Sequence, residues 1–92
     1  MIRRLRHKGL ERLFTTGNAS GVATQQARRI QLILAQLNVA HTPAMMDAPG
    51  LRFHALRGDR QGQFAVSVSG NYRIVFSFDG EDATDVDLVD YH

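Results

Sequence analysis

The spacing of the apolar residues changes part-way along this 92-residue chain, and that change constrains the fold more than any other feature. Before residue 40, Ala27, Ile30, Leu34 and Leu37 recur at the spacing of one helix face. After residue 50 the period becomes two, which is typical of half-buried strands. The alternating apolar positions are Phe64, Val66 and Val68, then Tyr72, Ile74, Phe76 and Phe78, and finally Val86 and Leu88. We therefore expect helices first and a sheet afterwards.

Turn-forming residues mark the ends of the helical part. Apolar positions within residues 10–14 predict a short first helix, which residues 15–18 (TTGN) should end. Ser20 or Thr24 is expected to cap the second helix, because a hydroxyl can accept a hydrogen bond from a free N–H of its first turn. Residues 40–50 contain both prolines of the chain, so they are expected to form a loop.

Hairpin-type sequences divide the second part. Residues 58–62, 69–71 and 79–81 are rich in Gly, Asp and Asn, and with residues 51–56 as the first strand they predict a four-stranded antiparallel meander. Residues 1–7 could add a short edge strand. The fold class expected is α+β, with two N-terminal helices packed on a four- to five-stranded, largely antiparallel sheet, as one domain over residues 1–92.

Composition excludes several classes of protein. The chain has no cysteine, which excludes disulfides and thiolate metal sites. No apolar run approaches the ~20 residues needed to cross a bilayer. The basic N-terminus has no apolar segment behind it, so it does not resemble a signal peptide, and a cytoplasmic protein without membrane contact is expected.

The charges are distributed unevenly along the chain. Residues 1–60 hold ten Lys/Arg and three acids, a net charge of +7, whereas residues 61–92 hold one Arg and six acids, a net charge of −5. Such asymmetry favours a polyanion partner for the basic part, although a solvated basic surface would look the same. Arg28 and Arg29 lie off the apolar stripe of the second helix and are expected to face water or to bind RNA phosphates.

Two histidines have neighbours suited to the cleavage of RNA. His54 precedes Arg57 by three residues, and His92 closes the sequence Asp90-Tyr91-His92. Cleavage without a metal needs a base for the 2′-OH, cations for the phosphorane and an acid for the leaving oxygen. Histidine suits proton transfer because its pKa of ~6.5 lies near neutral pH. Arginine suits phosphate binding because its planar fork never loses its charge.

Each of these residues also has a purely structural interpretation. Arg73 could pair with an acid of the last strand, and Tyr91 could be an aromatic residue at the edge of the core. His54 could be an ordinary strand residue, and His92 a frayed chain end. The three aspartates of the last strand do not predict a metal site, because alternation puts Asp85 and Asp87 on the face opposite Asp90.

Four segments in this order resemble the HigB branch of the RelE/ParE toxin–antitoxin superfamily. They are residues 2–10 (IRRLRHKGL), residues 51–62 (LRFHALRGDRQG), residues 71–76 (NYRIVF) and residues 89–92 (VDYH). The resemblance implies a RelE-like fold and cleavage of mRNA in the ribosomal A site, with growth arrest as the result. It also implies a HigA-type helix-turn-helix antitoxin as partner, and contact with operator DNA only through the complex with that antitoxin.

The resemblance assigns proton transfer to three residues and implies no metal or cofactor. His92 is expected to handle the proton, with His54 and Asp90 as helpers or alternates. The α-carboxylate of His92 would favour the imidazolium form of its side chain. A segment appended after His92 is therefore expected to slow mRNA cleavage, whereas an N-terminal tag is not.

The resemblance assigns substrate binding to three further residues. Arg73 and Arg57 would hold the phosphate, and Tyr91 would position the nucleotide. Two departures from the family pattern stand out. Arg57 replaces a common lysine, which keeps the charge but cannot act as a base because the pKa of arginine exceeds ~12. Tyr72 stands where many relatives have tryptophan, which changes packing more than chemistry.

Three other functions remain open from the sequence. A ParE-like inhibitor of DNA gyrase would not need His54 or His92. A non-catalytic module would bind RNA or a protein through its basic helix surface, and its binding would depend on Arg28, Arg29 or Arg57 and on salt. A free ribonuclease would cut naked RNA as fast as ribosome-bound mRNA.

Overall fold

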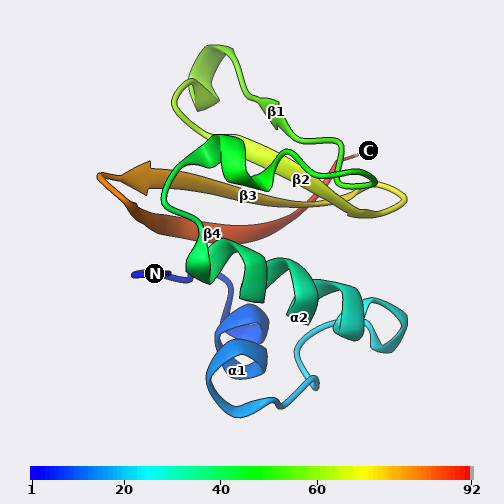
Figure 1. The fold of residues 1–92 in the computed structure, drawn as a ribbon. Coiled ribbons are helices and arrows are strands. Elements are labelled where there is room, and N and C mark those ends of the chain that lie inside the picture. Colours follow the sequence, from blue (N-terminus) through cyan, green and yellow to red (C-terminus); the bar gives the residue numbers. More distant parts are fainter. Residues whose placement is uncertain (92) are drawn as a thin grey trace.

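The computed structural model describes residues 1–91, and Figure 1 shows the helices packed on one side of an antiparallel sheet. Two α-helices and four strands form the fold, with two short 3₁₀ turns between them. In chain order the elements are α1 (Lys8–Thr16), α2 (Thr24–Val39), η1 (Pro43–Met46), β1 (His54–Ala55), η2 (Gly58–Arg60), β2 (Phe64–Ser69), β3 (Tyr72–Asp79) and β4 (Asp82–Asp90). The strand order is β1-β2-β3-β4, with every neighbouring pair antiparallel. The predicted α+β meander is confirmed.

The core lies between the helices and one face of the sheet, which we call the inner face. Its strand residues come from the predicted alternating positions, and its helix residues come from the predicted apolar stripe. The most deeply buried members are Leu10, Ile30, Ile33, Leu34, Leu37, Val66, Ile74, Phe76 and Val86. Apolar burial on this scale is what stabilises helices of this length, which are marginal on their own.

The N-terminal segment covers the β4 edge of the sheet. Ile2 and Leu5 form isolated parallel bridges with Ala83 and Val86 of β4. The N–H of Arg3 donates to the Ala83 carbonyl at 2.8 Å. An edge contact was predicted here, and its physical benefit is that the N–H and C=O groups of β4 are not left open to another chain.

The helix starts differ from the sequence-based expectation. The α1 N-cap is His7, whose Nδ1 accepts a hydrogen bond from the Leu10 N–H at 3.3 Å. The α2 N-cap is Ala23, which makes no side-chain cap hydrogen bond, so the prediction that Ser20 or Thr24 caps this helix is wrong. The chain enters α2 through tight packing of Gly21 against Gly9, where a side chain on either glycine would collide with the other's backbone.

The predicted loop and the predicted first strand also differ in detail. Residues 40–50 contain the turn η1, whose Met46 is buried in the core. β1 has only two residues, whereas residues 51–56 were predicted to be a strand. Arg52 has a left-handed backbone, with a φ of 51°, and this conformation interrupts extended pairing just before β1. Within the described chain, neither α-helix is long and apolar enough to span a membrane.

Candidate active site

The face of the sheet that turns away from the helices, which we call the outer face, carries two of the predicted site residues, His54 and Arg73. The register pairs His54 with Ala65, Ala65 with Val75, and Val75 with Asp87. Directly paired residues of antiparallel strands point to the same face, so His54 and Asp87 belong to one row across this face. The next row along the strands contains Ser67, Arg73 and Val89.

Arg73 is fixed at the end of the outer face near the β2–β3 hairpin. Its Nη1 donates to the Gly70 carbonyl at 3.0 Å and to the Tyr72 carbonyl at 3.2 Å, and lies 3.4 Å from the Ser67 hydroxyl. Among the described residues these contacts all involve Nη1, so the rest of the guanidinium fork can bind an anion. The ion pairs to Asp79, Asp82 and Asp85 are made by Arg3, Arg4 and the N-terminal ammonium, and not by Arg73.

The end of β4 lies beside Arg73. Asp90 pairs with Tyr72, the neighbour of Arg73, and the Tyr91 N–H donates to the Asn71 carbonyl at 2.8 Å. Asp90 has a further interaction within the molecule. His92 lies outside the described residues. The structure thus brings Arg73, Asp90 and Tyr91 to one end of the sheet, with Asp90 in the row of Tyr72, which faces away from the outer face that carries Arg73.

His54 is on the same face but across the sheet. It is exposed on β1, and its Nδ1 lies 2.9 Å from the Arg52 carbonyl. Three strand spacings separate it from β4, which amounts to ~14 Å at the usual interval between strands. A bound RNA would therefore have to cross the outer face to touch both His54 and the end of β4.

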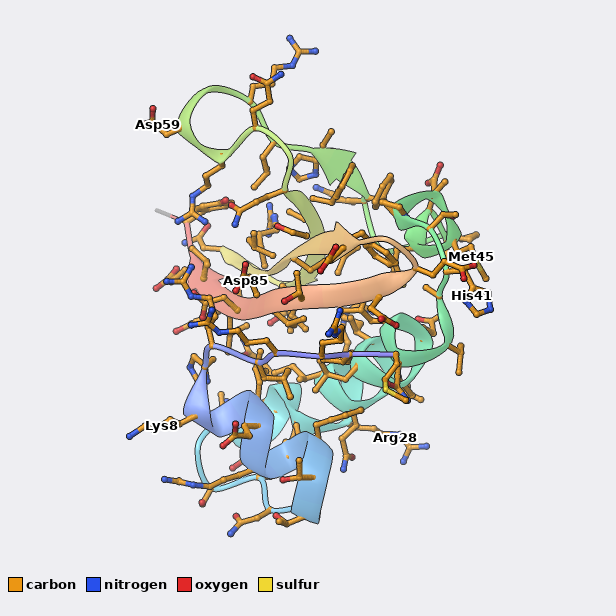
Figure 2. All side chains as sticks on the ribbon, turned by 90° about the vertical axis from the view of Figure 1, so that its left-hand side faces the viewer. Lys8, Arg28, His41, Met45, Asp59 and Asp85 are labelled. Carbon is orange, nitrogen blue, oxygen red and sulfur yellow. The ribbon has the colours of Figure 1, made fainter. Side chains whose placement is uncertain are left out.

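Three further predicted residues lie apart from Arg73. Arg57 is exposed just after β1, and because β1 and β2 are antiparallel, it lies towards the end of the sheet away from Tyr91. Arg28 projects from the helical side of the molecule, far from Asp59 at the tip of the β1–β2 connection (Figure 2).

Arg29 is half-buried and donates from Nη2 to the carbonyls of Gly50 and Ser67. Arg29 therefore contacts the backbone of the protein as well as solvent, and its expected role in binding RNA stays a prediction.

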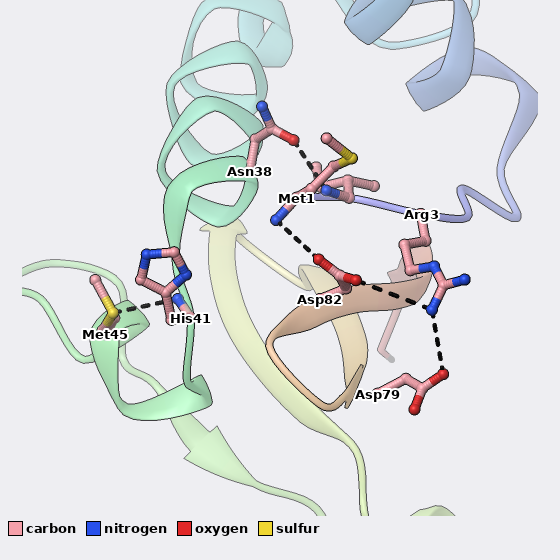
Figure 3. Close-up of polar contacts among 8 residues, drawn as sticks. Met1, Arg3, Asn38, His41, Met45, Asp79 and Asp82 are labelled. Atoms are coloured by element: carbon pink, nitrogen blue, oxygen red, sulfur yellow. Dashed lines mark hydrogen bonds and ion pairs between the residues drawn. The ribbon is translucent and has the colours of Figure 1, made fainter.

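The tertiary structure cancels part of the charge asymmetry. Arg3 pairs with Asp79 and Asp82 at 3.5 and 3.9 Å, and the N-terminal ammonium pairs with Asp82 at 3.4 Å (Figure 3). Arg4 pairs with Asp85 at 3.4 Å. The basic N-terminus therefore meets part of the acidic C-terminal half inside the molecule.

The aspartates of β4 are separated by their contacts as well as by their faces. Asp85 has a φ of 52° at an irregularity in the β3–β4 register and binds Arg4, while Asp87 accepts from the Leu88 N–H at 2.9 Å. Within residues 1–91, no group of three or more His, Asp or Glu side chains is placed to hold a metal ion.

Comparison with known proteins gives this arrangement its family. The model of the RelE-like toxins of the type II toxin–antitoxin system HigB matches residues 3–92. The protein named Endoribonuclease HigB from Proteus vulgaris is 37% identical over 92 residues, which cover the whole of both chains. The chain belongs to the HigB family. Its members are RelE-like toxins of type II systems, and the resemblance inferred from the four sequence segments is confirmed.

One residue of this HigB-family fold was missed by the sequence-based analysis. Ser67 connects the outer face to the rest of the molecule through its hydroxyl, its carbonyl and its N–H. No pattern singles it out, because a serine alternating with valines in a strand is ordinary. The capping role of His7 was also missed, and its signal in the sequence is its position directly before the Lys8-Gly9-Leu10 start of α1.

Proposed function

We propose that this protein is an endoribonuclease that cuts mRNA in the ribosomal A site and thereby arrests growth. The observation that carries the proposal is that Arg73, Asp90 and Tyr91 lie at the same end of the sheet in a HigB-family chain. The name of the Proteus vulgaris relative supports an endoribonuclease activity. The ribosome as the place of cleavage follows from the likeness of residues 51–62 and 89–92 to the family pattern.

The chemistry proposed is an in-line attack of the ribose 2′-oxygen on the adjacent phosphorus, without a metal. A base removes the 2′-OH proton, the 2′-O–P bond forms, the P–O5′ bond breaks, and an acid protonates the departing 5′ oxygen. His92 is assigned one of these proton transfers, and Asp90 and His54 are helpers or alternates. Arg73 stabilises the charge that develops on the phosphorane, because its guanidinium is already held in place before the substrate arrives.

The other assignments follow from exposure and position. Tyr91 would stack on an unstacked nucleotide at the end of β4. Arg57 would bind a phosphate further along the RNA, because it lies beyond the other end of β1. His54 would contact RNA that crosses the outer face. Arg28 would bind, if any RNA, a segment on the helical side of the molecule.

A type II toxin needs a partner that holds it inactive. We propose a helix-turn-helix antitoxin of the HigA type as that partner, with operator DNA bound only through the complex. The proposed substrate complex contains mRNA and the 70S ribosome. The membership in the HigB family supports the antitoxin, and the guanidinium of Arg73 on the outer face together with the exposed Arg57 supports the RNA.

The test is primer extension on a translated mRNA with wild-type protein and His92→Ala. We expect discrete cuts at codons in the A site with the wild type, and a loss of ~10²- to 10⁴-fold with the variant, which is the usual contribution of a general acid or base. Equal cutting of naked RNA would make it a free ribonuclease. Growth arrest that survives replacement of both His54 and His92 would favour gyrase inhibition. RNA binding without cutting would leave a non-catalytic module.

A further inference from the structure

Arg29 differs from its neighbour Arg28 in every contact. Arg28 is exposed, whereas Arg29 is half-buried beneath residues 50–51 and β2. Its Nη2 donates to the Gly50 carbonyl at 2.8 Å and to the Ser67 carbonyl at 3.1 Å. Its Nε is buried and has no hydrogen-bond partner among the described residues. Burying part of a guanidinium costs free energy. The two hydrogen bonds to carbonyls offset part of this cost and fix the position of the side chain.

Ser67 contacts both Arg29 and Arg73, so it links α2 to the outer face. While its carbonyl accepts from Arg29, its N–H donates to the Leu51 carbonyl at 2.7 Å. Its hydroxyl lies 3.4 Å from Nη1 of Arg73. One residue thus connects the half-buried Arg29 of α2 with the half-buried Arg73 that we assign to the phosphate.

The segment before His54 is also held by Arg29 and Ser67, through hydrogen bonds to the carbonyls of Gly50 and Leu51. β1 has only two residues, paired with Ala65 and Phe64, so its own ladder fixes it weakly. Before β1, Arg29 and Ser67 hold Gly50 and Leu51. The short stretch between Leu51 and His54 is stiffened by the contact of His54 Nδ1 with the Arg52 carbonyl at 2.9 Å.

We propose that Arg29 is a positioning residue of the active site, which sets the placement of Arg73 through Ser67 and of His54 through Gly50 and Leu51. The inference rests on the proposed nuclease function. It replaces a direct role of Arg29 in binding RNA, because Nη2 donates to two carbonyls of the protein and Nε is buried. A displacement of about 1 Å at a reacting group costs roughly 100-fold in rate, so a clamp behind the site has a measurable effect.

The experiment compares Arg29→Met with Arg29→Lys in single-turnover cleavage of mRNA on ribosomes. For Arg29→Met we expect a saturating rate about 10- to 100-fold lower. The half-saturating protein concentration should stay within about twofold, because no contact to the RNA is removed. Arg29→Lys should recover part of the rate, since an ammonium can still donate to one or both carbonyls. Arg12→Met, which removes an exposed cation of α1, is the matched control and should cleave as the wild type does.

A double-mutant cycle separates positioning from a loss of folding. In an Arg73→Lys background, Arg29→Met should lower the rate by a smaller factor than in the wild type, because the part of its effect that acts through Arg73 is already lost and only the part through His54 remains. Equal losses in both backgrounds, or an unchanged saturating rate with a raised half-saturating concentration, would overturn the inference. If urea titration finds Arg29→Met unfolded, the cycle is run with Arg29→Lys, on which the same two results decide.

The outcome for the wild type separates this inference from the function beneath it. If neither the wild type nor Arg12→Met cuts mRNA with or without ribosomes, the proposed nuclease is wrong and the positioning role is wrong with it. If both cut and Arg29→Met cuts at the same saturating rate, only the positioning role is wrong.

Discussion

The two edges of the sheet treat their arginines in opposite ways. At the β4 edge, Arg3 and Arg4 lie beside the strand and pair with acids of the chain's own C-terminal half. At the β1 edge, Arg52 and Arg57 are exposed, and no ion pair of the described residues involves them. A basic side chain is thus available to an RNA only where no carboxylate of the same chain already pairs with it. Sequence position alone makes all four look alike.

The largest effect should separate Arg73 from Arg3. We expect Arg73→Ala to lower mRNA cleavage by about 10²- to 10³-fold, the usual cost of removing a held donor to a developing oxyanion. Arg3→Ala should cleave within about twofold of the wild type, because the Arg3 side chain pairs with Asp79 and Asp82 of the same molecule. Rates come from primer extension under single-turnover conditions. Similar losses in both variants would show that net charge, rather than position, governs cleavage.

A smaller effect is expected at the β1 edge, in the salt dependence of RNA binding. Arg57→Ala removes one unpaired cation, so the slope of log affinity against log salt should fall by about 0.7, the value for one contact to single-stranded nucleic acid. Affinity at moderate salt should fall with it, while the saturating rate stays near that of the wild type. The measurement is binding of single-stranded RNA across a salt series. Arg4→Ala is the control from the other edge, and a matching change of its slope would contradict the distinction.

The smallest effect should appear in stability. The side chain of Arg4 in its pair with Asp85 is 69% exposed and that of Asp85 is 35% exposed, so solvent screens the attraction. We expect Arg4→Ala to lower the free energy of unfolding by less than about 1 kcal/mol. Urea titration in low and high salt measures this, and most of the difference should vanish at high salt. A loss of several kcal/mol would mean that the N-terminal segment is held by this pair rather than by Ile2 and the backbone bridges.

The fold was predictable because its signals are local. The apolar stripe of α2 and the alternating positions of β2, β3 and β4 each depend on residues close in sequence. The structure buries these positions fully or partly, except for Tyr72, which is exposed. The errors occurred where a non-local contact overrides a local preference. α2 begins without a hydroxyl cap, after a segment in which Gly21 packs against the distant Gly9. β1 is short where the left-handed backbone of Arg52 interrupts extended pairing.

The candidate site was predictable in its members more than in its geometry. The likeness to the HigB family named His54, Arg73, Asp90 and Tyr91 without placing them. The register then set Arg73, Asp90 and Tyr91 together and left His54 across the sheet. Their roles stay predictions until the variants are measured.

The sequence by itself determined the order of helices and strands, the residues of the core, and the family, because each of these is written in periodicity or in short motifs. Only the tertiary structure decided which arginines are free. Arg28 and Arg29 are adjacent and chemically identical, yet one is exposed and the other is bound to two carbonyls. The reason is physical: a cation's availability depends on the oxygens that lie within a few ångströms of it, and those oxygens come from segments distant in the sequence.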